Sequence, residues 1–364
     1  MRKTAIILLA ILIVISMSGC LQGGSSKNQV GTGYPGVEFI EFYPVNNKVP
    51  KSSDVSLYYA IQNNGYFDAE GVNVTIYNCG DIKTGTHSWI SKPYNCNDGI
   101  QLPSAGGVLV MPDRDQGVSG EVADAEVTLS TDFSVFPVGE TPHTFSARLV
   151  YNYTTTAARD VVFTTFNNWK EKGGNIETGV LMSSSKPAPI TVSVNAPDQA
   201  IIITGNETED QAQEFTIAVQ SRNTGGGYLK DKQLNSIKLC YDTNLVAPVV
   251  GSDKYVDDFV LCTGEDAAVW DQCCLTSGIQ TDAGEEGTSR NCLCVAEGGL
   301  DPKLKMIGVT NQWRDVSATF KTKMDADGKK AVVKVQDIAN FGATVKYTYM
   351  SDTSTQITLV GKSK

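Results

Sequence analysis

The chain has 364 residues, of which 41% are hydrophobic and 19% are charged, and its formal net charge is −10. This composition is typical of a globular protein and excludes a disordered chain, and the length allows two or three domains. The acidic balance argues against nucleic acid and anionic membrane surfaces as partners, since both require basic patches.

The first residues have the three parts of a secretory signal peptide. Arg2 and Lys3 give a positive start, an apolar run over 5–17 follows, and small residues precede Cys20. The run is shorter than the roughly 20 apolar residues that a membrane helix needs. We therefore expect a signal peptide over 1–19 and an exported chain.

The run Met17-Ser18-Gly19-Cys20 resembles the prokaryotic lipobox, whose cysteine becomes the lipidated first residue of the mature chain. Leucine usually stands where this chain has Met17. The alternatives are an ordinary signal peptide and an uncleaved anchor, and both also export the chain. Residues 21–35 are rich in Gly and Ser, which is typical of a flexible tether. We expect a lipid-anchored tether over 20–35, in the cell envelope, at the outer face of the cytoplasmic membrane or the cell surface.

Beyond this tether, apolar and polar residues alternate in short runs separated by Gly, Asn, Asp and Pro. The clearest run is DVSLYYAIQNNG (54–65), and similar runs continue to about residue 166. Such alternation predicts half-buried strands, and many short strands separated by turns predict a β-sandwich. We place the first sandwich at 36–168 and a linker at 169–187.

Residues 188–364 repeat this pattern, which predicts a second sandwich. The segment EFTIAVQSRNTG (214–225) aligns without gaps on residues 54–65, with alternating apolar positions and a closing Asn-x-Gly in both. Internal duplication explains this match, although any two amphipathic strands that end in such a turn look alike. We expect each turn glycine, Gly65 and Gly225, to adopt a positive φ, which glycine allows without a Cβ clash.

The first half also resembles a known family, the CARDB-type immunoglobulin-like domains of prokaryotic surface proteins. The matching residues are Val55, Leu57, Tyr59, Ile61, Asn63, Gly65, Ala69, Val72, Val74 and Ile76. The resemblance implies a seven-stranded sandwich used in adhesion or scaffolding, and it brings no catalytic residues. The overall expectation is an all-β fold of two tandem immunoglobulin-like β-sandwiches, the second with a disulfide-rich insert.

Nine cysteines are present, and eight remain if Cys20 carries lipid. An even set in an exported chain predicts disulfides, and the alternative is a thiolate metal site. We expect Cys79 to pair with Cys96, because no other cysteine is near them in sequence. The disulfide set is Cys79, Cys96, Cys240, Cys262, Cys273, Cys274, Cys292 and Cys294.

Six of these cysteines lie in the second half. Geometry disfavours bonds between Cys273 and Cys274 and between Cys292 and Cys294, since disulfides require a narrow range of Cα separations. We interpret 262–299 as an insert in the second sandwich that is held by disulfides. It is either a recognition surface or a purely structural staple.

No catalytic motif, cofactor site or metal site is found. His87 and His143 have no nucleophile motif nearby, and we interpret both as surface or strand residues. Asp325-Ala-Asp327-Gly328 resembles the start of a calcium loop but lacks its later ligands, which favours a hairpin turn. The acidic segment PDRDQG (112–117) carries no ligand pattern. Three N-glycosylation sequons begin at Asn73, Asn152 and Asn206.

These features favour a non-enzymatic surface lipoprotein that acts in adhesion, scaffolding or partner binding. Its expected partners are the membrane, through the lipid anchor, and a protein or glycan at the cell surface. One alternative is a surface solute or glycan binding module, which a concave patch of exposed Trp and Tyr would favour. The other is a carboxylate-dependent hydrolase, which two close, buried acids with perturbed pKa values would favour.

Overall fold

The computed structural model describes residues 36–50, 53–79, 83–88, 90–102, 107–130, 138–176, 185–205, 209–250, 255–256, 259–262, 290–296 and 313–361. Strands dominate these residues. The helices among them are α2 (Phe166–Glu171) and the short 3-10 helix η2 (Lys230–Lys232). The expected all-β fold is therefore confirmed.

The first sandwich has a five-stranded antiparallel sheet in the order β1–β3–β8–β5–β6. These strands are β1 (Val37–Pro44), β3 (Asp54–Asn63), β8 (Val122–Ser130), β5 (Lys83–His87) and β6 (Ile90–Tyr94). The facing sheet contains β7 (Gly99–Gln101), β4 (Glu70–Tyr77), the first half of β9 (Glu140–Thr165), the second half of β20 (Gln336–Val360) and β2 (Lys48–Pro50). Leu57 from one sheet and Leu149 from the other are buried in one hydrophobic cluster.

The second sandwich has a four-stranded sheet in the order β10–β12–β19–β15. These strands are β10 (Ile190–Asn195), β12 (Glu214–Asn223), β19 (Trp313–Thr322) and β15 (Val246–Pro248). The facing sheet contains β11 (Ile201–Ile203), the second half of β9, the first half of β20, β13 (Tyr228–Leu229), β14 (Ser236–Asp242), β18 (Arg290–Ala296), β17 (Phe259–Cys262) and β16 (Tyr255–Val256).

Aromatic rings hold the two sheets of the second sandwich together. Phe215 of β12 meets Phe163 of β9 with ring centroids 5.5 Å apart. Phe320 of β19 meets Phe341 of β20 at 5.1 Å. Buried aromatic pairs of this kind contribute about 0.5–1.5 kcal/mol each beyond the area they bury.

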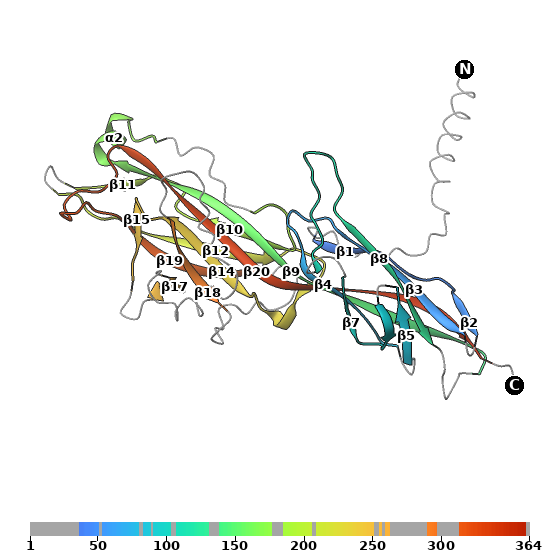
Figure 1. Ribbon diagram of the computed structural model, residues 1–364. Coiled ribbons are helices and arrows are strands. Elements are labelled where there is room, and N and C mark those ends of the chain that lie inside the picture. The colour runs from blue at the N-terminus through green and yellow to red at the C-terminus, as the bar shows by residue number, and fades with distance from the viewer. Residues whose placement is uncertain are drawn as a thin grey trace, which may run out of the picture. The chain divides into compact units, whose positions relative to one another are not determined.

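Strands β9 and β20 are shared between the two sandwiches (Figure 1). They pair antiparallel along their whole length, from Gln336 opposite Thr164 to Val360 opposite Glu140. In an immunoglobulin sandwich, strands C, F and G lie in one sheet. Here β9 corresponds to strand F of the first sandwich and continues as strand G of the second. β20 corresponds to strand F of the second sandwich and continues as strand G of the first. Each half of the chain thus completes a sheet of the other.

The strand pattern in the sequence predicts two sandwiches, each contiguous in sequence, at 36–168 and 188–364. In the structure, residues 153–165 lie in the second sandwich and residues 349–360 lie in the first. The local sequence is compatible with this exchange, because VYNYTTT (150–156) contains β-branched and aromatic residues and no Gly or Pro. Such residues favour a continuous strand, and Asn152 is the one residue of the segment that is common in turns.

The crossing point has approximate twofold symmetry. Its centre is the pair Asn152 and Thr348, which lie opposite one another in the β9–β20 ladder. The neighbouring positions on the buried face carry four tyrosines, here called the tyrosine quartet: Tyr151, Tyr153, Tyr347 and Tyr349. Adjacent rings lie 5.8–6.2 Å apart.

Quartet members at equivalent positions make equivalent contacts. Tyr347 accepts a 3.3 Å hydrogen bond from the backbone N–H of Ile190, the first residue of β10. Tyr151 has the same contact with the backbone of Val37, the first residue of β1. These repeated contacts support the predicted internal duplication, because chance similarity of strand patterns would not reproduce them.

The two Asn-x-Gly turns are held in the same way. Asn63 Oδ1 accepts from Gly65 N at 3.0 Å, and Asn223 Oδ1 accepts from Gly225 N at 3.2 Å. The expected positive φ is wrong for both glycines. Glycine is required for a different reason: a Cβ on Gly65 or Gly225 would collide with the hydroxyl of a quartet tyrosine.

Candidate functional site

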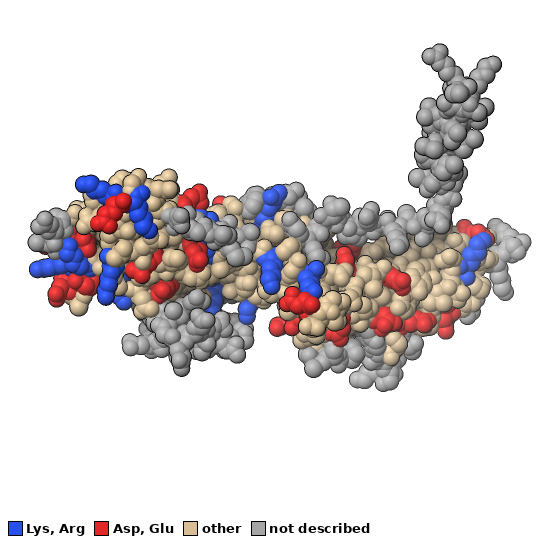
Figure 2. All heavy atoms as spheres, turned by 90° about the horizontal axis from the view of Figure 1, so that it is seen from above, with Lys and Arg blue, Asp and Glu red and all other residues tan. Residues whose placement is uncertain are grey.

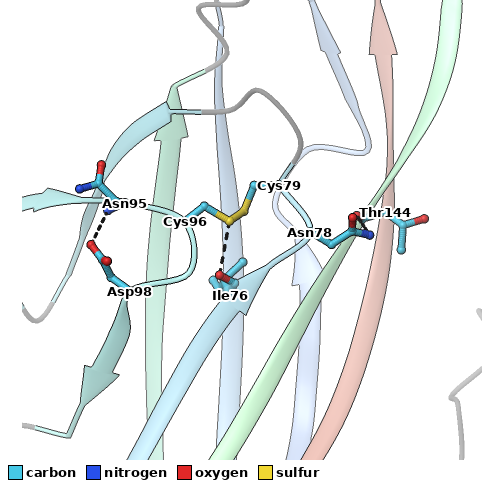
Figure 3. Close-up of a disulfide and its surroundings, with 7 residues drawn as sticks. All are labelled: Ile76, Asn78, Cys79, Asn95, Cys96, Asp98 and Thr144. Carbon is cyan, nitrogen blue, oxygen red and sulfur yellow. Dashed lines mark hydrogen bonds between the residues drawn. A yellow bond between two sulfur atoms is a disulfide. The ribbon is translucent and has the colours of Figure 1, made fainter.

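The first predicted disulfide is present. Cys79, directly after β4, is bonded to Cys96 in the turn before β7, with Cα atoms 6.2 Å apart (Figure 3). Cys96 Sγ also lies 3.4 Å from the carbonyl oxygen of Ile76. Asn78 beside it donates to the carbonyl of Thr144 at 3.2 Å. The bond ties the β4–β7 connection to the end of β4, which is a structural role.

The second half contains a cross-strand disulfide. Cys240 of β14 lies directly opposite Cys292 of β18, and the two are bonded with Cα atoms 4.0 Å apart. Cys294 is disulfide-bonded as well, and its partner is not Cys292. The side chain of Cys262 lies outside the described residues, although its backbone ends β17.

Several predicted sites fall outside the described residues. They are the signal peptide and tether with Cys20, the cysteines Cys273 and Cys274, the sequon at Asn206, and most of the insert 262–299. Of that insert, the structure describes only the strands β17 and β18 at its two ends.

No carboxylate pair of the kind that a hydrolase needs is found in the described part of the chain. None of its Asp or Glu residues is buried, and no group of three or more metal-ligating side chains occurs there. Asp325 has a lowered pKa, because backbone N–H groups such as that of Lys330 hydrogen-bond its carboxylate. Its loop is the expected hairpin turn, closed by a bridge between Met324 and Ala331.

The histidines also lie in strands. His143 belongs to β9, and burial lowers its pKa. Its ring packs edge-on against Phe145 with centroids 4.8 Å apart. His87 ends β5, and its side chain lies outside the described residues.

The two described sequons differ in exposure. Asn152 is exposed at the centre of the β9–β20 ladder, and its Oδ1 accepts from Thr348 Oγ1 at 2.7 Å. Asn73 is half-buried against Gly99, and its Oδ1 accepts from Thr75 Oγ1 at 3.4 Å. Asn152 is therefore the better placed of the two for a glycan.

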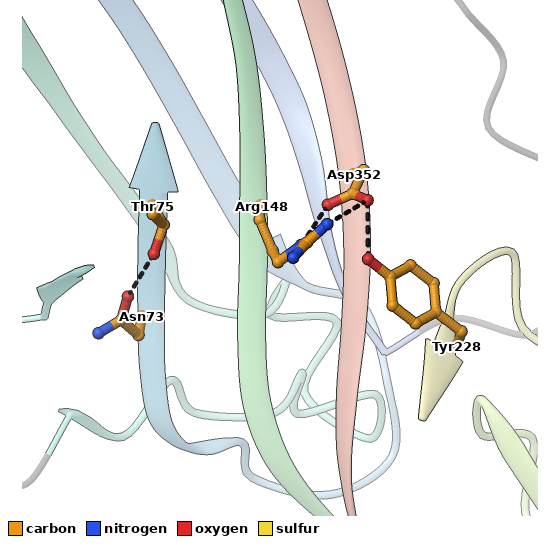
Figure 4. Close-up of polar contacts among 5 residues, drawn as sticks. All are labelled: Asn73, Thr75, Arg148, Tyr228 and Asp352. Atoms are coloured by element: carbon orange, nitrogen blue, oxygen red, sulfur yellow. Dashed lines mark hydrogen bonds and ion pairs between the residues drawn. The ribbon is translucent and has the colours of Figure 1, made fainter. Parts of the chain in front are cut away.

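Figure 4 shows a polar cluster on the outer face of the shared sheet, near the sequon at Asn73. Arg148 of β9 forms a two-point ion pair with Asp352 of β20, at 2.8 and 3.1 Å. Tyr228 donates to the same carboxylate at 2.8 Å, and Arg148 lies over its ring and that of Tyr77. Burial raises the pKa of Tyr228 to about 12. These groups form their hydrogen bonds and ion pair with one another. We therefore interpret the cluster as a structural link between the two halves and not as a ligand site.

The candidate interaction site is a hairpin over residues 109–121, here called the projecting hairpin. In Figure 1 it is the teal segment that stands clear of the strands before β8. Its strands pair through Val118 N to the Asp113 carbonyl at 2.8 Å and Glu121 N to the Val110 carbonyl at 3.1 Å. Its base is fixed by Asn63, whose Nδ2 donates to the Leu109 carbonyl at 2.8 Å.

The tip of the projecting hairpin is also braced. Arg114 lies over the Tyr66 ring at 4.0 Å, and its Nη2 donates to the Asn64 carbonyl at 3.0 Å. The Asp113 carboxylate accepts from two backbone N–H groups of the turn, at 3.1 and 3.0 Å. The hairpin is thus held at both ends by the Asn-x-Gly turn and its neighbours.

Large apolar side chains are exposed along this hairpin. Val110, Met111 and Val118 on it, and Val122 directly after it, are each between 45% and 57% exposed. Single exposed apolar residues are common, but several on one ordered hairpin make it the candidate interaction site. This site was not predicted from the sequence, because the acidic turn PDRDQG (112–117) separates the apolar residues on its two sides.

Comparisons with known proteins add little. No family model matches the chain, and no curated protein matches it. The resemblance to CARDB-type domains stays a prediction. Among solved structures, the chain is matched with the crystal structure of the CupB6 tip adhesin from Pseudomonas aeruginosa, with a TM-score of 0.15 and 9% identity over 91% of this chain and 100% of that one. A score this low carries no argument about fold or function. In the described part of the chain, no helix is long and apolar enough to cross a membrane.

Proposed function

We propose that this protein is an exported, lipid-anchored and non-enzymatic protein of the cell surface, which binds a partner protein through the projecting hairpin. The observation that carries the proposal is the set of exposed apolar side chains on this ordered hairpin. Because their backbone is already fixed, binding would cost little ordering entropy. Adhesion and scaffolding both require such a surface and need no catalytic group.

The cysteines support the cellular location. Disulfides persist in oxidising compartments and are rare in the cytosol, and the chain forms the bonds Cys79–Cys96 and Cys240–Cys292. Cys20 would carry the lipid, with residues 21–35 as the tether. A Cys20→Ser variant should then leave the membrane fraction. A wild-type protein that is found entirely in the soluble fraction would contradict the anchor.

The shared strands support a scaffolding role. β9 has 26 residues and β20 has 25, so each spans about 85 Å at roughly 3.3 Å per residue. Because both run through both sandwiches, the two sandwiches cannot hinge about a flexible linker. Such a body would present the projecting hairpin in a fixed orientation.

A photo-crosslinking side chain at position 118, in native cells, tests the partner. We expect a discrete crosslinked product, because Val118 is the most exposed apolar residue of the hairpin. The matched control is position 138, where Val138 is also exposed but lies outside the hairpin. The same product from both positions, or no product at 118, would contradict the proposal.

A further inference from the structure

A hollow of about 780 Å³ lies in the second sandwich, where β9 ends and α2 begins. Pockets that bind small ligands have volumes in this range. Its lining comes from three stretches distant in sequence: residues 165–171, the stretch from Ile203 in β11 to Asp210, and the loop 330–335. The projecting hairpin does not contribute to it.

The walls of this hollow are fixed by hydrogen bonds. Asn168 is 91% buried, and its Nδ2 donates to Thr164 Oγ1 at 2.8 Å. Thr164 Oγ1 in turn donates to the carbonyl of Val335 at 3.2 Å. On the other side, the Asp210 carboxylate accepts from Ala331 N at 2.9 Å. The lining groups are therefore held in place without a ligand.

The lining carries balanced charge. It contains two acids, Glu171 and Asp210, and two lysines, Lys330 and Lys334. Lys330 lies 3.4 Å from Asp210, so that pair is largely neutralised. Figure 2 shows lysine and arginine side chains close to acidic ones at this end of the body, and not a field of one sign. A small ion therefore gains little here, whereas a neutral polar molecule can use both donors and acceptors.

An aromatic surface adjoins these polar groups. Phe166 is 44% exposed and lines the hollow, and its ring stacks on Trp169 with centroids 5.7 Å apart. The stack restrains the Phe166 ring, part of which stays exposed. A ring beside amide, carboxylate and ammonium groups suits a ligand that has an apolar face and a rim of hydroxyl groups.

We propose that this hollow binds a neutral saccharide unit of a surface glycan. The sugar ring would pack its C–H face on Phe166, and its hydroxyls would hydrogen-bond to Glu171, Asn168 and Lys334. This inference rests on the proposed cell-surface location but not on the projecting hairpin. It assigns the protein a second ligand class at a separate site.

The test is saturation-transfer NMR on the whole exported chain, with chitotriose, mannotriose and maltotriose as neutral probes and a galacturonic acid trimer as the charged comparison. At least one neutral trisaccharide should bind. Phe166→Ala should weaken that binding about three- to tenfold, the size expected for one aromatic contact. Lys334→Ala should weaken it as well. Both side chains are exposed, so the variants should fold, as their circular dichroism can verify.

The matched control is Val118→Ala on the projecting hairpin, which should leave sugar binding unchanged. If no neutral trisaccharide binds, if only the charged trimer binds, or if Phe166→Ala and Lys334→Ala both leave binding unchanged, the inference is overturned. The crosslinking at position 118 is a separate measurement. If that crosslinking fails, the proposed protein partner is contradicted and the saccharide site is not. If saccharide binding fails, the proposed protein partner is unaffected.

Discussion

Raising the pH above the ordinary tyrosine pKa should unfold this protein, because the tyrosine quartet must keep its protons in the folded state. Burial raises the pKa of Tyr153 to about 12, and it also raises the pKa values of Tyr151, Tyr347 and Tyr349. In the unfolded chain all four would titrate near pH 10. Below about pH 10 both states hold these protons, so the quartet causes no pH dependence there.

The magnitude follows from proton linkage. Between about pH 10 and the folded-state pKa, the unfolded chain loses protons that the folded chain retains, so stability falls as pH rises. One pH unit costs about 1.4 kcal/mol for each tyrosine. At about pH 11 the quartet therefore removes about 5 kcal/mol, which is comparable with the whole stability of a typical domain.

Urea denaturation at about pH 8, 10 and 11, together with the absorbance of tyrosinate, measures this effect. Tyr349→Phe is the informative variant, because it should lower the stability at about pH 8 but also reduce the loss of stability at alkaline pH. At about pH 8 it should cost about 1 kcal/mol, since it leaves the half-buried Gly227 N–H without its 2.9 Å acceptor. Between about pH 10 and 11 it should reduce the loss by about 1.4 kcal/mol.

The matched control is Tyr43→Phe, whose side chain is 46% exposed on β1. This variant should change neither the stability at about pH 8 nor the loss of stability at alkaline pH. Stability that stays constant up to about pH 11, or an alkaline loss that Tyr349→Phe leaves unchanged, would refute the reasoning.

Three further predictions test the fold. Gly225→Ala should destabilise by about 1–3 kcal/mol in urea, because the new Cβ strikes the Tyr349 hydroxyl; an unchanged midpoint would contradict the close approach. Replacing Cys79 and Cys96 by serine should cost about 3 kcal/mol in thermal denaturation, given a closed loop with a separation of 17 residues, and equal stability would rule out a role for the bond. Deleting 352–361 should lower hydrogen-exchange protection in the first sandwich and spare the second, whereas uniform loss or no loss would contradict the exchanged strands.

The local features were predictable because they depend on neighbours in sequence. Alternation in residues 54–65 identifies β3 and its buried side chains, and the isolation of Cys79 and Cys96 identifies their bond. The turn at Asp325 follows from its turn residues. Each of these depends on backbone geometry over a few residues, which the residue types specify directly.

The candidate sites were not predictable in the same way. The projecting hairpin owes its order to Asn63 and Arg114, which brace it from positions far along the chain. The hollow beside α2 brings Asn168 close to Asp210 and to the loop 330–335. No periodicity in the sequence reports such contacts, because they depend on which strands pair.

The sequence alone determined the strands, the two Asn-x-Gly turns and the disulfide of the first half. Only the tertiary structure decided that β9 and β20 exchange between the halves. The absence of Gly and Pro from residues 150–156 allows a straight strand but does not specify its partner. In the crossed arrangement, the buried rings of the tyrosine quartet pack against one another, and the hydroxyls of Tyr347 and Tyr349 accept hydrogen bonds from the backbone of Ile190 and Gly227.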